Sequence, residues 1–344
     1  MKKALSLLFL IGISLFMFGQ GTLAQSYPKM KLKFANQLSK KMPPSKPDIF
    51  VATQLQKRTN GAVKVKMFHG GTLGNHQEMI DLVGEGAVDI GNFAAAYVFS
   101  RLPMEAFYSI PLVYPDVPTL VELGRKGWEN SKKMQADHVK NGLYPFNHKG
   151  LGIIRILSKK PIRTLADLKG LKIRSFGAVY PKVLSRLGAI PVNMQFHEVY
   201  EGLQRGTVDA ALTSYGLAAA FKYYEVAKYM SEINLGTDAA GRSYVNLDLY
   251  NSWPQNLKAL FEQIVLESEA MGVKVMVGFD NWAKGAMKKA GVEYIPFEDQ
   301  AEVNQHRNYA IDLTADTIIA QGKEYEKPAR AYAAWLKAEL KKRN

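Results

Sequence analysis

The chain has 344 residues, of which 45 are Lys or Arg and 31 are Asp or Glu, so its formal net charge at neutral pH is +14. It contains no cysteine, which excludes disulfide frameworks, thiol catalysis and cysteine-based metal sites. The basic residues are dispersed, apart from Lys159-Lys160 and the tail Lys341-Lys342-Arg343. We therefore expect a solvated basic surface and no nucleic-acid partner.

The N-terminus has the pattern of a secretory signal peptide. Two lysines precede an apolar run from Ala4 to Phe18, and small residues lead up to Ala24. A membrane-spanning helix needs about 20 apolar residues, and Gly19-Gln20-Gly21 ends this run short of that length. We predict that residues 1–24 direct export to the periplasm and are cleaved near Ala24. About 320 residues then remain, which suits two domains better than one.

Strands and helices alternate through the first two thirds of the remaining chain. Hydrophobic alternation predicts strands over 31–35, 63–68 and 89–93, with a helix over 48–59 after the first of them. This order indicates a wound sheet with helices on its faces. A second series begins near Gly150, with strands over 152–157, 171–174 and 208–212, a short capped helix from Thr164 and a helix over 181–187.

The two series share one spaced pattern. Glu78 stands eight residues before Gly86, and Glu198 stands eight residues before Gly206. Each glycine is followed by any residue, then Val and Asp, which is typical of a helix ended by glycine and followed by a strand. The repeat predicts two related α/β lobes.

The last third of the chain is more helical. A long helix is predicted from about 256 to 277, a strand over 291–295 and an amphipathic helix over 329–341. A helix of that length has room to brace both lobes. No low-complexity linker separates the lobes, so we expect the chain to cross between them more than once and to form a hinge. The predicted units are lobe I (25–151 with 238–279), lobe II (152–237 with 280–330) and a C-terminal helix (331–344).

Enzyme signatures are incomplete throughout. Gly84-x-Gly86 and Gly150-x-Gly152 both lack the third glycine of a dinucleotide fingerprint. His197-Glu198 begins like a zinc helix, but Glu201 stands where a second histidine is needed. A nucleophile elbow and a phosphate loop are also missing from the sequence. We predict no catalytic residue, no metal and no cofactor.

Arg174 is the strongest candidate for binding a ligand. It ends the predicted strand 171–174, and ligands of wound sheets bind beyond the carboxyl ends of the strands. A guanidinium there offers a planar fork that matches a carboxylate. The alternative, since the strand alternates between apolar and basic residues, is that Arg174 extends to solvent.

Five segments together resemble the substrate-binding proteins of tripartite ATP-independent periplasmic (TRAP) transporters, the DctP-like family. These segments are Phe68 to Gly74, Gly86 to Asp89, Leu168 to Arg174, Phe196 to Gln204, and Val208-Asp209. The resemblance implies two wound α/β lobes joined by a hinge with a long bracing helix, a periplasmic binding-protein fold similar to type II. It also implies an organic carboxylate as ligand and the TRAP permease membrane subunits as partners.

The resemblance assigns roles to particular residues. It implies that Arg174 pairs with the ligand carboxylate, that Arg155 adds a second contact and that Phe196 lines the pocket. Thr213 stands where many relatives have an asparagine, and it offers only a hydroxyl. The predicted ligand-binding set is completed by Phe176, Asn92, Phe93, Tyr97, Tyr215 and Asn36.

The ligand class follows from the low charge of this set. Residues 92–97 are small, apolar or aromatic, so we expect a monocarboxylate with an apolar or aromatic body rather than a dicarboxylate or sialic acid. The alternative is that the aromatic residues belong to the core. The predicted function is solute capture by a monomer for a TRAP permease. Two other functions remain open from the sequence, an exported enzyme acting on a small organic acid on the same scaffold, and a solute sensor that docks on a receptor.

Overall fold

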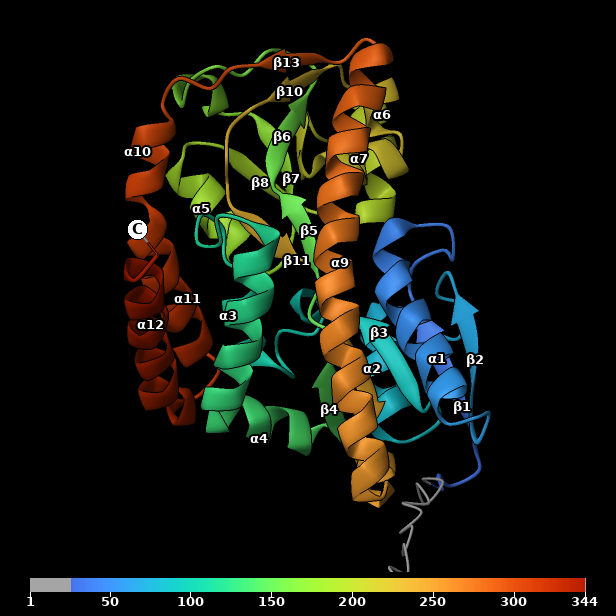
Figure 1. The fold of residues 1–344 in the computed structure, drawn as a ribbon. Helices are drawn as coiled ribbons and strands as arrows, with labels where there is room; N and C mark the ends of the chain where they lie inside the picture. The colour runs from blue at the N-terminus through green and yellow to red at the C-terminus, as the bar shows by residue number, and fades with distance from the viewer. Residues whose placement is uncertain (1–25, 344) are drawn as a thin grey trace, which may run out of the picture.

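Two sheets form the centres of two lobes in the computed structural model, which describes residues 26–343 (Figure 1). A five-stranded sheet has the order β2-β1-β3-β12-β4, and a six-stranded sheet has the order β13-β10-β6-β9-β7-β8. The predicted fold class, two α/β lobes with a bracing helix, is therefore confirmed. The predicted signal peptide, residues 1–24, lies outside the described residues.

Lobe I is built on the five-stranded sheet. Its strands are β1 (Met30–Asn36), β2 (Val63–His69), β3 (Ile90–Phe93), β4 (Leu143–Phe146) and β12 (Arg242–Asn246). β1 pairs in parallel with β2 and β3, whereas β12 is antiparallel to β3 and β4. Its helices include α1 (Lys46–Arg58), α2 (His76–Gly84) and α8 (Leu247–Ser252). The first three strands and α1 match the predicted segments closely. The alternation is seen at buried Leu32 and Phe34 of β1, whereas all four residues of β3 are buried.

Lobe II is built on the six-stranded sheet. Its strands are β6 (Arg155–Ser158), β7 (Lys172–Ser175), β8 (Ile190–Asn193), β9 (Ala210–Thr213), β10 (Tyr229–Ser231) and β13 (Glu293–Ile295). Its helices are α5 (Tyr180–Arg186), α6 (Val199–Arg205) and α7 (Tyr215–Ala220). The predicted helix from Thr164 is only a short 3-10 turn, Ala166–Leu168.

The predicted strand over 152–157 is wrong in one respect, since it is divided into two. β5 (Gly150–Ile153) pairs with β11 (Thr237–Ala239) in a separate two-stranded sheet, and β6 then joins lobe II. Gly152 has φ +93°, in the left-handed region that favours glycine, which lets the chain change direction there. The two strands of this small sheet are therefore crossings between the lobes.

The sequence repeat is a structural repeat at its helices. Glu78 and Glu198 each accept the backbone N–H of the residue three positions earlier, at 2.8 and 2.7 Å, which completes a capping box. Gly86 and Gly206 both have φ +78°, as the glycine after a helix requires.

The two aspartates that end the repeat also make matching bonds. The Asp89 carboxylate accepts the backbone N–H of Lys33 in β1 at 2.7 Å, and the Asp209 carboxylate accepts that of Lys172 in β7 at 3.0 Å. Each aspartate thus fixes the parallel strand beside its own. The two lobes use the same device to set strand register.

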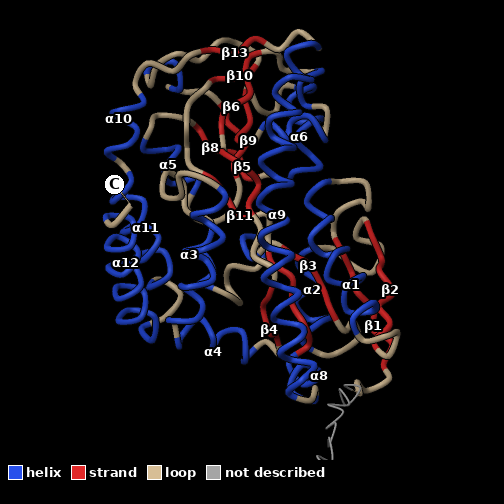
Figure 2. The backbone as a smooth tube through the Cα atoms, in the orientation of Figure 1, coloured by secondary structure: helices blue, strands red, loops and turns tan. Residues whose placement is uncertain are grey.

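Helix α9 (Gln255–Lys289) has 35 residues and runs past both lobes (Figures 1 and 2). The prediction placed its end near 277, before Gly278, but the helix continues through Gly278 and Gly285 and ends just before Gly291, which has φ +83°. At about 1.5 Å per residue the helix is roughly 50 Å long. It packs against α1, α3 (Val117–Asn130), α7 and β5. The predicted bracing role is confirmed.

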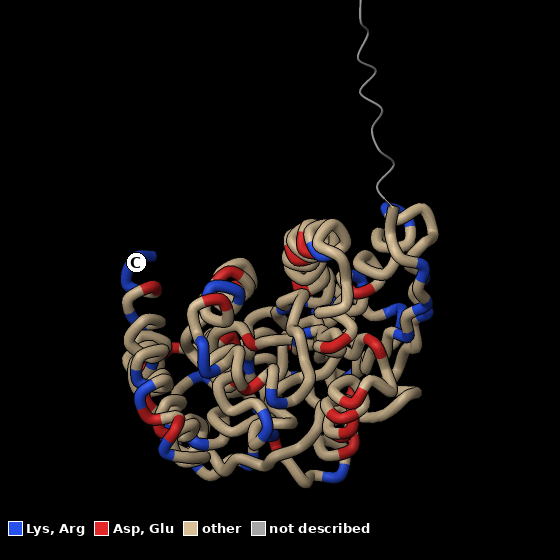
Figure 3. The backbone as a smooth tube through the Cα atoms, turned by 90° about the horizontal axis from the view of Figure 1, so that it is seen from below, with Lys and Arg blue, Asp and Glu red and all other residues tan. Residues whose placement is uncertain are grey.

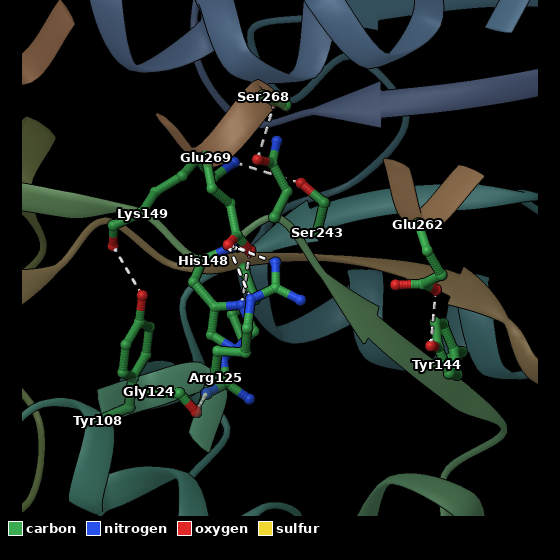
Figure 4. Close-up of polar contacts among 12 residues, drawn as sticks. Tyr108, Gly124, Arg125, Tyr144, His148, Lys149, Ser243, Glu262, Ser268 and Glu269 are labelled. Carbon is green, nitrogen blue, oxygen red and sulfur yellow. Dashed lines mark hydrogen bonds and ion pairs between the residues drawn. The ribbon is translucent and has the colours of Figure 1, made fainter. Parts of the chain in front are cut away.

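A buried polar network holds α9 against the segment that leaves lobe I (Figure 4). The Glu269 carboxylate on α9 accepts hydrogen bonds from the backbone N–H and ring nitrogen of His148, both at 2.8 Å, and pairs with Arg125. The neighbouring Lys149 donates to Asp48 of α1 at 2.8 Å. Because each buried charge in this network has a partner, the segment is held tightly where β4 leads to β5.

The C-terminal region forms a helical layer beside α3, at the left of Figure 1. Its helices are α10 (Gln300–Gln305), α11 (Arg307–Ile319) and α12 (Glu326–Lys341), with α4 (Lys132–Lys140) nearby. Lys and Arg alternate with Asp and Glu along the backbone, as Figure 3 shows. Within residues 26–343, no helix has the length and apolar character to cross a membrane. The division into lobe I, lobe II and a separate helix 331–344 stays a prediction.

Candidate functional site

A cavity lies where strands of both lobes end. Both lobes and the crossing segments supply its wall, and the ends of β3, β7 and β9 all open onto it. Its position beyond the carboxyl ends of parallel strands is the usual ligand site of wound sheets. The wall consists of Leu38, Met42, Pro44, His76, Asn92, Ala94, Ala96, Tyr97, Leu151, Ile154, Arg174, Phe176, Phe196, Leu212, Thr213, Leu217, Asp238, Ala239 and Ala240.

Arg174 is buried in this wall, with 2% of its surface exposed. Its Nε donates to the carbonyl of Met194 and its Nη1 to that of Leu212, both at 3.0 Å, and its guanidinium lies 4.8 Å from the ring centre of Phe176. Among the described residues it forms no salt bridge, and burial lowers its pKa. The solvent-facing alternative is therefore excluded. A buried guanidinium without a counter-ion is an anion site.

Six of the ten predicted ligand-binding residues lie together in the cavity wall. Arg174, Phe176, Phe196 and Thr213 come from lobe II, and Asn92 and Tyr97 come from lobe I. Asn92 Nδ2 donates to the carbonyl of Arg242 at 3.0 Å, and the Thr213 hydroxyl bonds to the carbonyl of Ser214 at 3.2 Å. These contacts hold both side chains in place at the edge of the cavity.

The other four predicted residues lie outside the cavity wall. Arg155 donates to the carbonyl of Glu232 at 3.1 Å and lies over the ring of Tyr215, whose hydroxyl donates to the Glu232 carboxylate at 2.6 Å. Phe93 stacks on Tyr244 in the core, with ring centres 4.1 Å apart. Asn36 donates to buried Asp48 at 2.7 Å.

Strand alternation explains two of these positions. Ile154, between β5 and β6, lines the cavity, whereas the next residue, Arg155, projects away from it over the ring of Tyr215. In the same way Asn92 and Ala94 face the cavity while Phe93, between them, faces the core. The predicted set included both Asn92 and Phe93, which a pleated strand places on opposite faces.

Two polar residues of the wall were missed by the sequence analysis. His76 begins α2, and Ala94 N–H donates to its Nδ1 at 3.2 Å. Burial lowers the pKa of His76 to about 4, so the ring is neutral at pH 7. Asp238 in β11 is 3% exposed, and burial raises its pKa to about 7. The capping residue before His76 was a usable signal, whereas no sequence pattern marked Asp238.

His76 also connects the lobes. Its ring centre lies 4.9 Å from that of Tyr97 in lobe I and 5.9 Å from that of Phe196 in lobe II. The latter contact is edge to face, at an interplanar angle of 85°. Within residues 26–343, no group of His, Cys, Asp or Glu side chains is arranged to hold a metal ion.

Known proteins resemble the chain over different spans. It is 32% identical over 180 residues to the 2,3-diketo-L-gulonate-binding periplasmic protein YiaO of Escherichia coli, covering 52% of this chain and 54% of that protein. The chain thus spans about half the length of the curated relatives that match it with comparable identity. A solute-binding protein of Albidiferax ferrireducens is 24% identical over 275 residues, or 78% of this chain and 74% of that protein.

Solved structures share the fold at low identity. A TRAP periplasmic solute-binding protein from Desulfovibrio salexigens with bound orotic acid has a TM-score of 0.78 at 24% identity, covering 90% of this chain and all of that one. Another, from Roseobacter denitrificans with bound β-D-glucuronate, has a TM-score of 0.75 at 24% identity, covering 89% and 99%.

The family model of the bacterial extracellular solute-binding proteins, family 7, matches residues 38–315. This span includes every residue of the cavity wall. The members of this family and the matching structures are binding proteins of transporters rather than enzymes. The chain belongs to the DctP family of bacterial extracellular solute-binding proteins, as its motifs predicted.

Proposed function

We propose that the protein captures an organic carboxylate in the periplasm and delivers it to a TRAP membrane permease. The observation that carries this proposal is the buried, unpaired guanidinium of Arg174 in the cavity wall. Removing an arginine from water without a counter-ion is costly, and a bound carboxylate restores the missing partner. The planar fork of a guanidinium suits the two oxygens of a carboxylate.

The finer proposal is a monocarboxylate with an apolar or aromatic body. Arg174 supplies the positive charge of the described wall, because His76 is neutral. Most other wall residues are aliphatic or aromatic, including Leu38, Phe176 and Phe196. Orotate and glucuronate, the ligands of the two structures above, each carry one carboxylate. Of these two, the flat ring of orotate is the better match for aromatic walls.

Closure of the two lobes around the ligand is part of this proposal. A ligand on Arg174 of lobe II reaches lobe I residues such as Tyr97 across the same cavity. Only a closed form offers contacts from both lobes, so ligand shifts the population toward it. Small-angle X-ray scattering is expected to show a smaller radius of gyration at saturating ligand. An unchanged scattering profile would contradict closure.

Delivery to a permease is proposed from the family and its TRAP-transporter structures. We propose that the exported chain acts as a monomer, with its signal peptide removed near Ala24. N-terminal sequencing of periplasmic protein tests the cleavage site. Retention of the leader in the inner membrane would contradict it.

The decisive experiment is identification of the ligand that the protein carries. Protein purified from the periplasm is denatured, and the released small molecules are identified by mass spectrometry. Protein refolded without ligand is then titrated with the acid that was found. We expect a carboxylate that binds unchanged. A released molecule without a carboxyl group, or chemical conversion of the bound acid, would contradict solute capture.

A further inference from the structure

His76 presents an unused hydrogen-bond donor to the cavity. Ala94 N–H donates to Nδ1, which assigns the proton of the neutral ring to Nε2. Nε2 is buried and has no partner among the described residues, and the side chain is 8% exposed. A buried donor without a partner costs stability, so this position needs an acceptor from the ligand.

Asp238 presents an acceptor to the same cavity. The Ser109 hydroxyl donates to Oδ1 and the Ala239 backbone N–H also bonds to this carboxyl, which has further lone pairs for a ligand donor. Asp238 is near enough to Arg174 to interact with it electrostatically, yet the two form no ion pair. The carboxyl offsets part of the charge of Arg174 without forming a contact ion pair. It lies on a crossing strand, between the lobe that holds Arg174 and the lobe that holds His76.

We propose that His76 and Asp238 are specificity-determining residues that select carboxylates whose body carries a neutral polar group, such as a hydroxyl. The inference rests on the proposed function, since it assumes that Arg174 holds the carboxylate. A hydroxyl accepts a hydrogen bond from His76 and donates one to Asp238, and lactam or amide groups offer the same pair of functions. The ligand then has one charged end and one polar group in an otherwise apolar cavity.

The same two residues disfavour ligands with a second carboxylate and ligands whose body has no polar group. A second carboxylate has no donor for the ionised form of Asp238, and beyond Arg174 the described wall offers it no cation. A body without polar groups leaves Nε2 of His76 without a partner. Both alternatives lose hydrogen bonds in a site from which water is excluded, where such losses are largest.

Two matched ligand series test the selection. Phenylacetate, mandelate and phenylmalonate differ only in carrying hydrogen, hydroxyl or carboxylate on one carbon, and propionate, lactate and methylmalonate repeat the series with a smaller body. Affinities are measured by calorimetry on ligand-free protein. In at least one series we expect the hydroxyl acid to bind about 5- to 100-fold more tightly than the unsubstituted acid. The dicarboxylate is expected to bind most weakly.

Two substitutions of one residue separate ligand binding from structure. His76→Gln places an amide donor near the position of Nε2, whereas His76→Asn keeps an acceptor for Ala94 N–H and loses that donor. We expect the preference for the hydroxyl acid to survive in His76→Gln and to disappear in His76→Asn. If the preference survives in His76→Asn and disappears in His76→Gln, the role of His76 is to accept the Ala94 N–H and not to bind the ligand. Asp238→Asn is expected to weaken the exclusion of the dicarboxylates.

Different results would contradict the role of His76 and Asp238 and the proposed capture of a carboxylate. Equal affinity for the unsubstituted and hydroxyl acids in both series overturns the inference while solute capture stands. A ligand released from the native protein that is a carboxylate without any other polar group overturns it as well. If none of the six acids binds, the released ligand decides, because a carboxylate bearing a hydroxyl or amide supports the inference. A ligand without a carboxyl group overturns the proposed function itself.

Discussion

The two lobes place different residues at the same position of one shared scaffold. Asp89 and Asp209 make matching bonds to β1 and β7, and in these strands Phe34 pairs with Ile90 as Ile173 pairs with Ala210. The next residue is Ala35 in lobe I and Arg174 in lobe II. Ala35 is 2% exposed within a hydrophobic core, whereas Arg174 lies in the cavity wall. The scaffold is repeated in both lobes, but only lobe II has a cation at this position.

The two lobes therefore have different roles in ligand binding. Lobe II holds the anion, and lobe I supplies an uncharged wall through Asn92, Tyr97 and His76. The position of Arg174 corresponds in lobe I to a core position, which has no room for a cation. Four experiments test how far the comparison holds.

The largest effect is expected when the missing charge is introduced into lobe I. Ala35→Arg puts a long cation into a packed core without a partner, which combines overpacking with an unpaired buried charge. We expect a loss of about 3–5 kcal/mol in the free energy of unfolding, or failure to fold. Urea denaturation measures it. Ala35→Ser is the size-matched control, and a stable arginine variant would show that lobe I also has room for a cation.

Removing the charge from lobe II is expected to abolish most ligand binding. Arg174→Ala takes away one partner of a buried ion pair, at about 2–5 kcal/mol, which corresponds to roughly 30-fold to several thousand-fold weaker binding. Arg174→Lys keeps the charge without the fork and should also bind poorly. Calorimetry with the released ligand measures both.

Substitutions of two other arginines show whether the loss of binding is specific to Arg174. Arg101→Ala removes an exposed arginine that pairs with Asp81, so affinity should not change. Arg155→Ala decides whether the second contact implied by the family resemblance exists, although Arg155 lies outside the wall. Near-native affinity in Arg174→Ala would show that the charge has another role.

The third prediction concerns pH and Asp238. Burial raises the pKa of Asp238 to about 7, above the value of about 4 expected in an unfolded chain. The folded state therefore binds this proton more tightly, so its contribution to stability is present at low pH and is lost as pH rises through about 7. Each unit of pKa shift is worth about 1.4 kcal/mol, so the loss is on the order of a few kcal/mol.

The measurement is the difference between ligand-free wild type and Asp238→Asn at pH 5 and pH 8. We expect the variant to gain stability relative to wild type at the higher pH. The subtraction removes the opposite contributions of His76 and His148, whose pKa values burial lowers to about 4. A difference that does not change with pH would place the Asp238 pKa in its ordinary range.

The smallest effect should be equal in the two lobes. Glu78→Ala and Glu198→Ala each remove one capping box, and we expect each to cost about 0.5–1 kcal/mol in urea denaturation. Glu129→Ala, at an exposed position in α3, is the control. Unequal losses in the free energy of unfolding would show that the two capping boxes share a geometry but contribute differently to stability.

Sequence patterns predicted part of each sheet and the position of Arg174, because both depend on local rules, whereas β4, β8, β10, β11 and β12 were not predicted. Apolar alternation and the glycine after each helix are properties of neighbouring residues, so β1, β2, β7 and α9 were found without the structure. The broken strand at Ile154 was not predictable from alternation, since the break depends on a partner strand more than eighty residues away, β11. His76 and Asp238 face the cavity through tertiary packing, which single-residue patterns do not record.

The sheet order also governs when each lobe can be completed during synthesis. β4 ends at Phe146, and its one neighbour in the sheet, β12, begins only at Arg242. The strands β6 to β10 of lobe II are made in between, and the edge strand β13 follows last. Most of the chain therefore emerges from the ribosome before either sheet has all of its strands. Both lobes mature late and together, and a chain truncated before β12 has neither a complete lobe I nor a closed cavity.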